Sequence, residues 1–293
     1  MQPKLSVIVP IYKQEKTIER DLRRIKGVLS KLRYSSELIG VIDGFVDDSF
    51  KNASKVPGVK VVGYSINKGK GHAVRFGMAK SRGDIVAFID SGMEIDPNGI
   101  SMILEHMEWY NADIIIGSKR HPASQINYPL ERRIISRIYQ LFVRLFVGLN
   151  VTDTQLGLKV YKRAVLENIL PRLIVKRYAF DLEMLAVAYS LGYRRIFEAP
   201  IKVNYNFGDL THASTLKSMW RAFVDTLAVI YRLRILHYYS SSNKRKWLYD
   251  PELNFRINYF KDDPGNFKTG HNSFVCFNNK FRRSLALIFD KGE

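Results

Sequence analysis

The sequence predicts an α/β fold in which a mostly parallel sheet carries helices on both faces. Short apolar runs alternate with stretches of helical periodicity as far as about residue 118, which is the pattern of successive β-α-β units. Some of these runs, such as IVAFI at residues 85–89, contain no polar residue, as expected for strands covered on both faces. With 293 residues, 46% of them hydrophobic, the chain has enough apolar side chains for one large or two modest domains.

The predicted elements follow one another in a regular order. The expected strands are residues 5–11, 37–43, 59–65, 85–89 and 112–118, and the expected helices are residues 15–32, 70–81 and 97–110. In open α/β sheets, ligands bind at the carboxyl ends of the parallel strands. We therefore expect the functional side chains in the segments that follow these strands.

A loop rich in glycine and lysine precedes the helix expected at residues 70–81. Gly69 and Gly71 allow a close approach that a Cβ would block. Lys68 and Lys70 add positive charge beside the N–H groups that begin the helix, and such groups favour an anion. The composition of the loop therefore predicts a phosphate site.

Three carboxylates follow the strand expected at residues 85–89. Asp90 ends the apolar run, and Glu94 and Asp96 come within the next six residues. A hard divalent cation that bridges protein carboxylates to substrate phosphates needs such oxygen ligands. Together with the basic loop, these residues predict a metal-assisted phosphate site, whereas alone they would be read as a solvated acidic turn.

Cysteine and histidine content narrows the chemistry. A single cysteine, Cys276, excludes an internal disulfide and a cysteine-rich zinc site, which fits a reducing compartment. The six histidines have no metal-ligand spacing. The N-terminal apolar run is too short for the core of a signal peptide, and no run approaches the roughly 20 apolar residues that span a bilayer. We expect a cytoplasmic protein.

The formal net charge of +18 and the sequence pI near 9.8 require an anionic partner. Nucleic acid, anionic lipid and phosphorylated substrates all qualify on charge alone. Zinc-finger, RNP and basic-zipper patterns are absent from the sequence, so nucleic acid is not the expected partner. Nothing in the sequence selects an oligomeric state.

Two basic amphipathic segments lie in the second half of the chain. Residues 130–150 and 215–239 each place apolar residues at helical spacing among arginines. Such helices either pack on a core or lie in a membrane interface, and the basic run at residues 244–246 adds attraction to anionic lipid. We expect a catalytic domain at residues 1–212, an interfacial helix at 213–240 and a C-terminal tail at 241–293 to which we assign no role.

Six ordered motifs resemble those of family 2 glycosyltransferases with the GT-A, Rossmann-like nucleotide-diphospho-sugar transferase fold. Within that family they are similar to the dolichyl- and polyprenyl-phosphate glucosyltransferases and mannosyltransferases. The motifs are VIVPIYKQEK (7–16), VIDGFVDDSF (41–50), NKGKGHAVRFGMAKSRGDIVAFIDSG (67–92), IIIGSKR (114–120), DTQLGLKVYKR (153–163) and YAFDLEMLAVAYSLGYRRIFEAPIKVNY (178–205). The third and fifth favour the glucosyl branch. The resemblance implies a GT-A catalytic domain followed by C-terminal amphipathic helices.

The resemblance also implies roles for individual residues. The expected nucleotide and nucleotide-sugar contacts are Pro10, Tyr12, Glu15, Asp43, Lys70, Gly71, Ser91 and Lys119, with Ser118 beside them. The expected metal ligands are Asp90 and Glu94, for Mg²⁺ or Mn²⁺. The expected catalytic and acceptor-side residues are Asp90, Arg133, Arg137, Asp153, Gln155, Lys159, Asp181 and Glu183.

The chain departs from the family pattern at the metal and nucleoside motifs. Asp90, Ser91 and Gly92 stand where the family has Asp-Ala-Asp, so Glu94 is the candidate for the second carboxylate. Ile42 replaces the first aspartate of the nucleoside motif. A carboxylate at Asp43 accepts an N–H from uracil or guanine alike, so Asp43 does not identify the donor. The resemblance to the glucosyl branch makes UDP-glucose the favoured donor and GDP-mannose the alternative.

The implied reaction is an inverting transfer of a sugar, with glucose favoured, to a polyprenyl or dolichyl phosphate at the cytoplasmic surface of an anionic membrane. A phosphate monoester, whose second pKa is about 6, needs no strong base. A saccharide hydroxyl as acceptor would instead need a carboxylate such as Asp181 or Asp153 to take its proton. A third reading is a degenerate transferase kept as a nucleotide- or nucleic-acid-binding module, motivated by Gly92.

Overall fold

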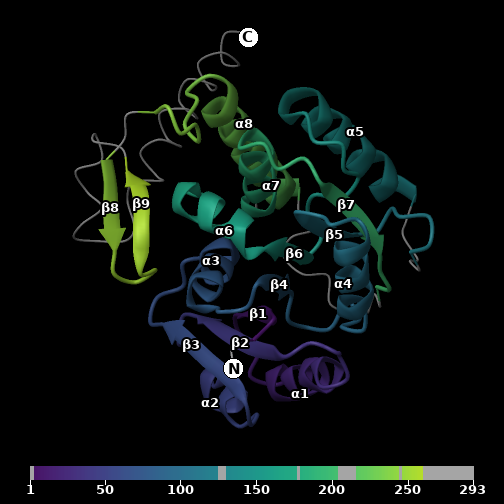
Figure 1. The fold of residues 1–293 in the computed structure, drawn as a ribbon, viewed down its shortest axis with the longest axis vertical. Helices are drawn as coiled ribbons and strands as arrows, with labels where there is room; N and C mark the ends of the chain where they lie inside the picture. The colour runs from purple at the N-terminus through teal and green to yellow at the C-terminus, as the bar shows by residue number, and fades with distance from the viewer. Residues whose placement is uncertain (1–2, 125–129, 177–178, 204–215, 244–245, 260–293) are drawn as a thin grey trace.

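A seven-stranded sheet forms the centre of the molecule (Figure 1). The computed structural model describes residues 3–124, 130–176, 179–203, 216–243 and 246–259. The strands are β1 (Leu5–Ile11), β2 (Ser36–Asp43), β3 (Val59–Tyr64), β4 (Ile85–Ile89), β5 (Ile114–Ser118), β6 (Leu158–Lys162) and β7 (Ile196–Pro200). Their order in the sheet is β3-β2-β1-β4-β6-β5-β7. The predicted α/β class and the five predicted strands are confirmed, with bounds within two residues of those expected.

One strand interrupts the parallel arrangement. β1 pairs in parallel with β2 and β4, β2 with β3, and β5 with β7, whereas β6 lies antiparallel between β4 and β5. The prediction of a mostly parallel sheet is therefore confirmed. β6 carries part of the 153–163 motif. Because β6 runs antiparallel to β4, the residues just before β6 lie next to the carboxyl end of β4.

Helices cover both faces of the sheet. They are α1 (Ile18–Leu29), α2 (Ser49–Ser54), α3 (Lys70–Lys80), α4 (Gly99–Trp109), α5 (Leu130–Val147), α6 (Arg163–Ile169), α7 (Phe180–Ser190) and α8 (Leu216–Arg234), with a 3₁₀ turn at Leu170–Arg172. Residues of α1, α2 and α4 share one buried cluster with one face of the strands, and residues of α3, α5, α6, α7 and α8 share a second cluster with the other face. The chain thus forms three layers.

The residue pattern explains why the two clusters are separate. Val7 and Val9 of β1 belong to one cluster and Ile8, between them, to the other, because side chains alternate across a strand. On α1, the buried residues Ile18, Leu22, Ile25 and Leu29 recur at helical spacing and form one stripe toward the sheet.

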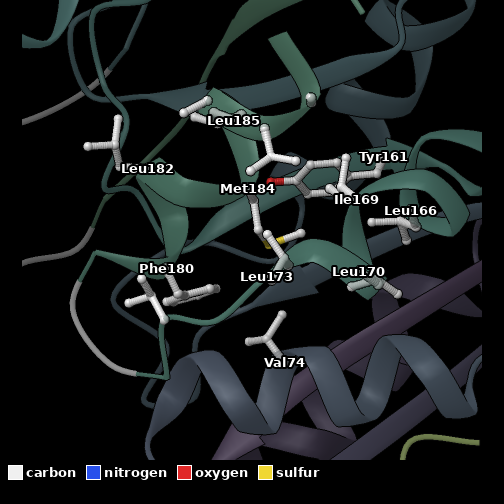
Figure 2. Close-up of a cluster of buried hydrophobic side chains, with 14 of the residues drawn as sticks. Val74, Tyr161, Leu166, Ile169, Leu170, Leu173, Phe180, Leu182, Met184 and Leu185 are labelled. Atoms are coloured by element: carbon white, nitrogen blue, oxygen red, sulfur yellow. The ribbon is translucent and has the colours of Figure 1, made fainter. Parts of the chain in front are cut away.

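Figure 2 shows the cluster on the α3 side, where α6 and α7 pack over β6. Val74 of α3, Leu166 of α6, Met184 of α7 and Tyr161 of β6 all belong to this cluster, and each is at most 1% exposed. Burying a large apolar side chain completely contributes about 1.5–3 kcal/mol. α7 is apolar on most of its surface for this reason, and it carries Asp181 and Glu183 into the interior.

The C-terminal part of the described chain forms a hairpin. β8 (Lys246–Asp250) and β9 (Phe255–Tyr259) pair antiparallel, and Leu253 in the connecting loop is 1% exposed within the α3-side cluster. The sequence did not predict this hairpin, and residues 260–293 lie outside the described part. Among the described helices, none combines the length and the hydropathy needed to cross a bilayer.

Candidate functional site

Asp43 ends β2 and fixes the loop that precedes α3. Its carboxylate accepts hydrogen bonds from the backbone N–H groups of Lys68 at 2.7 Å and Gly69 at 2.9 Å. The Asn67 amide and the Tyr64 hydroxyl also donate to it, each at 2.9 Å. Asp43 is 3% exposed, and hydrogen bonds to a charged acceptor are roughly twice as strong as neutral ones. The loop is therefore tied to the end of β2.

Two amides in the first turn of α3, those of Gly71 and His72, also have partners within the protein. The N–H of Gly71 donates to the carbonyl of Lys176 at 2.9 Å, and the N–H of His72 donates to the carbonyl of Gly69 at 3.0 Å. These backbone amides, and those bound to Asp43, are therefore not the free phosphate ligands that the loop composition predicts. An anion at this place therefore needs side-chain ligands in addition to any that the backbone still offers.

Lys70 supplies such a side chain. Its Nζ lies 2.6 Å from Oδ1 and 2.8 Å from Oδ2 of Asp90, which directly follows β4. The ring centroids of Phe88 and Phe180 lie 5.8 and 5.6 Å from the same ammonium. Burial lowers the pKa of Lys70, but the carboxylates of Asp90 and Asp181 outweigh it, so that the pKa is raised. Lys70 is charged at neutral pH.

Gly157 makes room for the Asp90 carboxylate. The N–H of Asp90 donates to the carbonyl of Gly157 at 2.9 Å. A Cβ at position 157 would lie 1.9 Å from Oδ2 and 2.1 Å from Cγ of Asp90, far inside contact distance. Asp90 can therefore occupy its position only because residue 157 is a glycine. The sequence did not reveal this role.

Lys159 and Asp181 form an ion pair in the interior. Lys159 comes from β6 and Asp181 from α7, and their side chains are hydrogen-bonded to each other. The residues are 0% and 3% exposed. Burial raises the pKa of Asp181 and lowers that of Lys159, and in each case the charge of the partner opposes the shift. Both were predicted on the acceptor side, and the structure shows each already engaged by the other.

The turn after Asp90 carries the other predicted metal ligand. Gly92 has a φ of +94°, in the left-handed region that favours glycine, and Ser91 precedes it. Glu94 is exposed, and its charge helps to raise the pKa of Lys70. Among the described residues, no three or more His, Cys, Asp or Glu side chains gather closely enough to hold a metal ion. Two carboxylates provide enough protein ligands for Mg²⁺ at a phosphate site only when substrate oxygens complete the shell, so Asp90 and Glu94 remain the predicted ligands of Mg²⁺ or Mn²⁺.

The residues predicted to contact the nucleoside gather at the ends of β1 and β2. Pro10 is buried in β1, whereas Tyr12, just after that strand, is 43% exposed. β1 and β2 pair in parallel as far as Ile11 opposite Ile42, and Tyr12 and Asp43 are the residues that follow this last pair. Glu15 accepts the N–H of Asp48 at 3.3 Å. The fold thus brings all four predicted nucleoside residues to one corner of the sheet.

Asp153 joins two segments at the end of β5. One of its oxygens accepts the N–H of Lys119 at 3.2 Å, and the other accepts the N–H of Gln155 at 3.2 Å. Ser118 and Thr152 have hydroxyl oxygens 3.2 Å apart. Asp153 is 8% exposed, so its carboxylate mainly holds the Lys119 segment against the 153–163 motif.

The predicted acceptor arginines lie on α5. Arg137 is exposed, and the side chain of Arg133 lies outside the described part of the chain. Tyr139 of the same helix accepts a hydrogen bond from Gln155 at 3.3 Å and lies 2.9 Å from the Thr226 hydroxyl of α8. These contacts link α5 and α8 to the 153–163 motif.

Glu183 is an anchor within the core. Its carboxylate accepts the N–H groups of Ile174 and Val175, at 3.1 and 2.9 Å, and the Tyr239 hydroxyl at 2.6 Å. It is 0% exposed. Burial raises its pKa, and the Arg232 charge opposes that shift. Sequence reasoning missed Tyr239, because its partner lies 56 positions earlier and only the fold brings them together.

Asp43 at the end of β2, Asp90 after β4 and Lys70 at the start of α3 lie where ligands bind in open α/β sheets. The family model of glycosyl transferase family 2 matches residues 6–170, more than half of the chain. The chain therefore belongs to glycosyl transferase family 2. The resemblance noted in the sequence motifs is confirmed at this level.

Curated relatives include polyprenyl-phosphate glycosyltransferases. Dolichyl-phosphate beta-glucosyltransferase of Drosophila melanogaster is 32% identical over 205 residues, which cover 64% of this chain and 63% of that protein. Undecaprenyl-phosphate mannosyltransferase of Micrococcus luteus is 29% identical over 204 residues, covering 66% of this chain and 81% of that protein. The chain thus spans less than two thirds of the length of the Drosophila relative.

A solved structure confirms the fold. Glucosyl-3-phosphoglycerate synthase of Mycobacterium tuberculosis, crystallised with Mn²⁺, uridine diphosphate and phosphoglyceric acid, superposes with a TM-score of 0.58 at 19% identity. The match covers 88% of this chain and 87% of that one. It establishes the predicted GT-A architecture for this protein.

Proposed function

We propose that the protein transfers a sugar, with glucose favoured, from a nucleoside-diphosphate donor to a polyprenyl or dolichyl phosphate. The observation that carries the proposal is the contact between Lys70 and Asp90 at the end of β4. This contact brings an ammonium and a carboxylate together at the end of β4, which supports a donor diphosphate and a metal ion at the same end of the sheet as Asp43 and Tyr12. The names of the Drosophila and Micrococcus relatives support a lipid phosphate as the acceptor.

Each group has a defined task in this reaction. An oxygen of the acceptor phosphate attacks the anomeric carbon, and the bond from that carbon to the donor diphosphate breaks with inversion. The electron pair leaves with the nucleoside diphosphate, whose charge Lys70 stabilises. Asp90 and Glu94 would hold Mg²⁺ or Mn²⁺, which supplies Lewis-acid neutralisation of the same diphosphate. Tyr12 and Asp43 would face the nucleoside.

The state of Asp181 supports a phosphate acceptor over a sugar hydroxyl. A hydroxyl acceptor needs a carboxylate that is free to take its proton. Asp181 is 3% exposed and bonded to Lys159, and Asp153 is 8% exposed and holds two backbone amides. A phosphate monoester, with a second pKa of about 6, is already an anionic nucleophile at neutral pH.

We further propose that α5 contacts an anionic membrane surface. Ile138, Leu141 and Leu145 are 65%, 69% and 73% exposed, and their spacing places them on one face of the helix. Arg137 and Arg144, both exposed, flank this apolar stripe. An apolar stripe bordered by arginines is typical of a helix that lies in a membrane interface. The charge of +18 favours the anionic, cytoplasmic surface of a membrane.

The proposal is tested by offering each donor with each acceptor class. Labelled UDP-glucose and GDP-mannose, with and without Mg²⁺ or Mn²⁺, are incubated with a short polyprenyl phosphate or with free saccharides. A metal-dependent, lipid-linked glucose is expected, and a lipid-linked mannose would select the alternative donor. Transfer only to saccharides, or donor binding without any transfer, would overturn the lipid-phosphate reading. The Glu108→Gln variant, which loses a surface ion pair with Arg33, serves as the active control.

A further inference from the structure

The loop between β8 and β9 places a carboxylate on Lys68. Glu252 accepts hydrogen bonds from the Lys68 ammonium at 2.7 Å through Oε1 and at 2.6 Å through Oε2. The two side chains are 33% and 25% exposed. Nε2 of His72 lies 3.9 Å from the same carboxylate, and the Tyr64 ring centroid lies 5.0 Å from the ammonium. Lys68 is thus enclosed on the side of the hairpin.

The fold fixes where Glu252 lies. Asp250 accepts the backbone N–H groups of Glu252 and Leu253, at 2.9 and 3.1 Å. Leu253 is 1% exposed in the core cluster. On β9, the Phe255 ring lies 5.6 Å from the Arg75 guanidinium of α3. Figure 1 shows the hairpin standing beside α3 at the edge of the molecule. The carboxylate is therefore presented to the loop by a packed element.

The two lysines of the loop engage different partners. Lys70 contacts Asp90, whereas Lys68 contacts Glu252. Between them, Asp43 binds the backbone of the loop. The loop is thus held at three points, and removing the Glu252 contact would leave it held only by Asp43 and by the contact of Lys70 with Asp90.

We propose that Glu252 is a positioning residue of the donor site, which holds Lys68 and the 67–70 loop so that Lys70 presents its ammonium at Asp90. The inference rests on the proposed function for the ligand, a nucleoside-diphosphate sugar. Lys68 is then an anchor of the loop and contacts no phosphate. The 246–259 hairpin belongs to the catalytic unit and is not part of a separate tail.

The test compares Glu252→Gln, Lys68→Gln and the double variant with the Glu108→Gln control. Calorimetry gives the affinity for UDP and GDP with Mn²⁺, and kinetics give kcat and KM for the donor. Each single variant is expected to weaken donor binding about tenfold. The double variant should bind the donor no more weakly than either single variant, because both changes remove the same charged contact. The kcat of all three should stay within about twofold of the wild-type value. A purely structural defect would lower kcat and the active fraction together.

Three results would overturn the inference. Additive losses, with Lys68→Gln the worse, would mean that Lys68 contacts the donor directly. Tighter donor binding by Glu252→Gln would mean that the carboxylate competes with the donor phosphates. Unchanged hydrogen exchange at residues 67–71 in Glu252→Gln would mean that Glu252 does not hold the loop. The exchange measurement needs no ligand, so it remains decisive if the wild-type protein binds neither nucleotide and the proposed function fails.

Discussion

Gly157 borders the space that the Asp90 carboxylate occupies: a Cβ at position 157 would lie 1.9 Å from Oδ2 of Asp90. The two residues lie at adjacent positions of the sheet because β6 runs antiparallel beside β4. The same carboxylate contacts Lys70 at 2.6 Å. The placement of the proposed metal ligand therefore depends on a residue that has no functional group of its own.

Replacing Gly157 by alanine should displace Asp90 and disable the donor site. We expect donor turnover to fall by about 10² or more, because a misplaced catalytic group costs that much, while the far-UV circular dichroism is retained. Gly27→Ala is the matched control, since nothing lies within 4 Å of the added methyl group, and an exposed helix gains about 1 kcal/mol from this change. Full activity of Gly157→Ala would show that Asp90 tolerates another position.

Lys70→Gln should strongly lower kcat for the donor sugar, while the free energy of unfolding should change little. The loss of one preorganised charge at a developing negative charge costs about 10²–10³ in kcat. Steady-state kinetics at varied donor concentration measure this loss of kcat. A second variant, Asp90→Asn, should lose the activation of the enzyme by Mn²⁺. Equal metal activation of Asp90→Asn and the wild-type protein would contradict the metal assignment.

Removing one partner of the buried pair should destabilise the fold strongly. Lys159→Met leaves Asp181 buried without its partner, which costs about 3–5 kcal/mol. The double variant Lys159→Met with Asp181→Leu should recover most of that free energy of unfolding, because no uncompensated charge remains. Urea unfolding measures the free energy of unfolding of the single and the double variant. If both variants were equally stable, Lys159 and Asp181 would not be energetically coupled.

Charged substitutions on α5 should release the protein from vesicles. Leu141→Asp and Leu145→Asp each remove an exposed apolar side chain, and about 1.4 kcal/mol per side chain corresponds to a tenfold loss of affinity. Cosedimentation with anionic vesicles measures this affinity. The urea midpoint of each variant should not fall below that of the wild type, which shows that the variants remain folded. Trp109→Asp, at an 81% exposed position on α4, is the control and should leave vesicle binding intact. Equal losses from all three variants would contradict a specific role for α5.

Docking of the hairpin should weaken in acid. His72 and Lys68 lower the pKa of Glu252 from its ordinary 4.5 to about 2. A carboxyl group with a lowered pKa in the folded state stabilises that state above its unfolded pKa and ceases to do so as pH falls through its folded pKa. The stability difference between wild type and Glu252→Gln should therefore be constant above about pH 5 and vanish between pH 4.5 and 2. A difference that persists at pH 2 would rule out the ionised carboxylate as its source.

Local pattern predicted much of the fold. Apolar runs gave five strands of the sheet, and helical periodicity gave α1, α3, α4, α5 and α8 to within a few residues. Other elements escaped it. Strands β6 and β7 were read only as functional motifs, the 246–259 hairpin only as part of the C-terminal tail, and helices α2, α6 and α7 were not predicted. The strands were missed because the pairing partner of a strand is not encoded in the spacing of its own residues.

For the site, the sequence predicted which residues take part but not which hydrogen bonds and ion pairs they form. It placed Asp43, Lys70 and Asp90 near a nucleotide, and the fold brings Lys70 to Asp90. It also predicted free backbone amides at the start of α3. The structure corrects that prediction for Lys68, Gly69 and Gly71, because Asp43 and the Lys176 carbonyl already accept the hydrogen bonds of these three amides.

The sequence by itself determined the α/β class, the family and the chemical character of the site, because periodicity, charge and motif spacing are properties of consecutive residues. Only the tertiary structure decided that Gly157 makes room for Asp90, that Lys159 neutralises Asp181, and that Glu252 holds Lys68. Each of these contacts joins segments distant in the chain, and their geometry exists only once the sheet and its helices have packed.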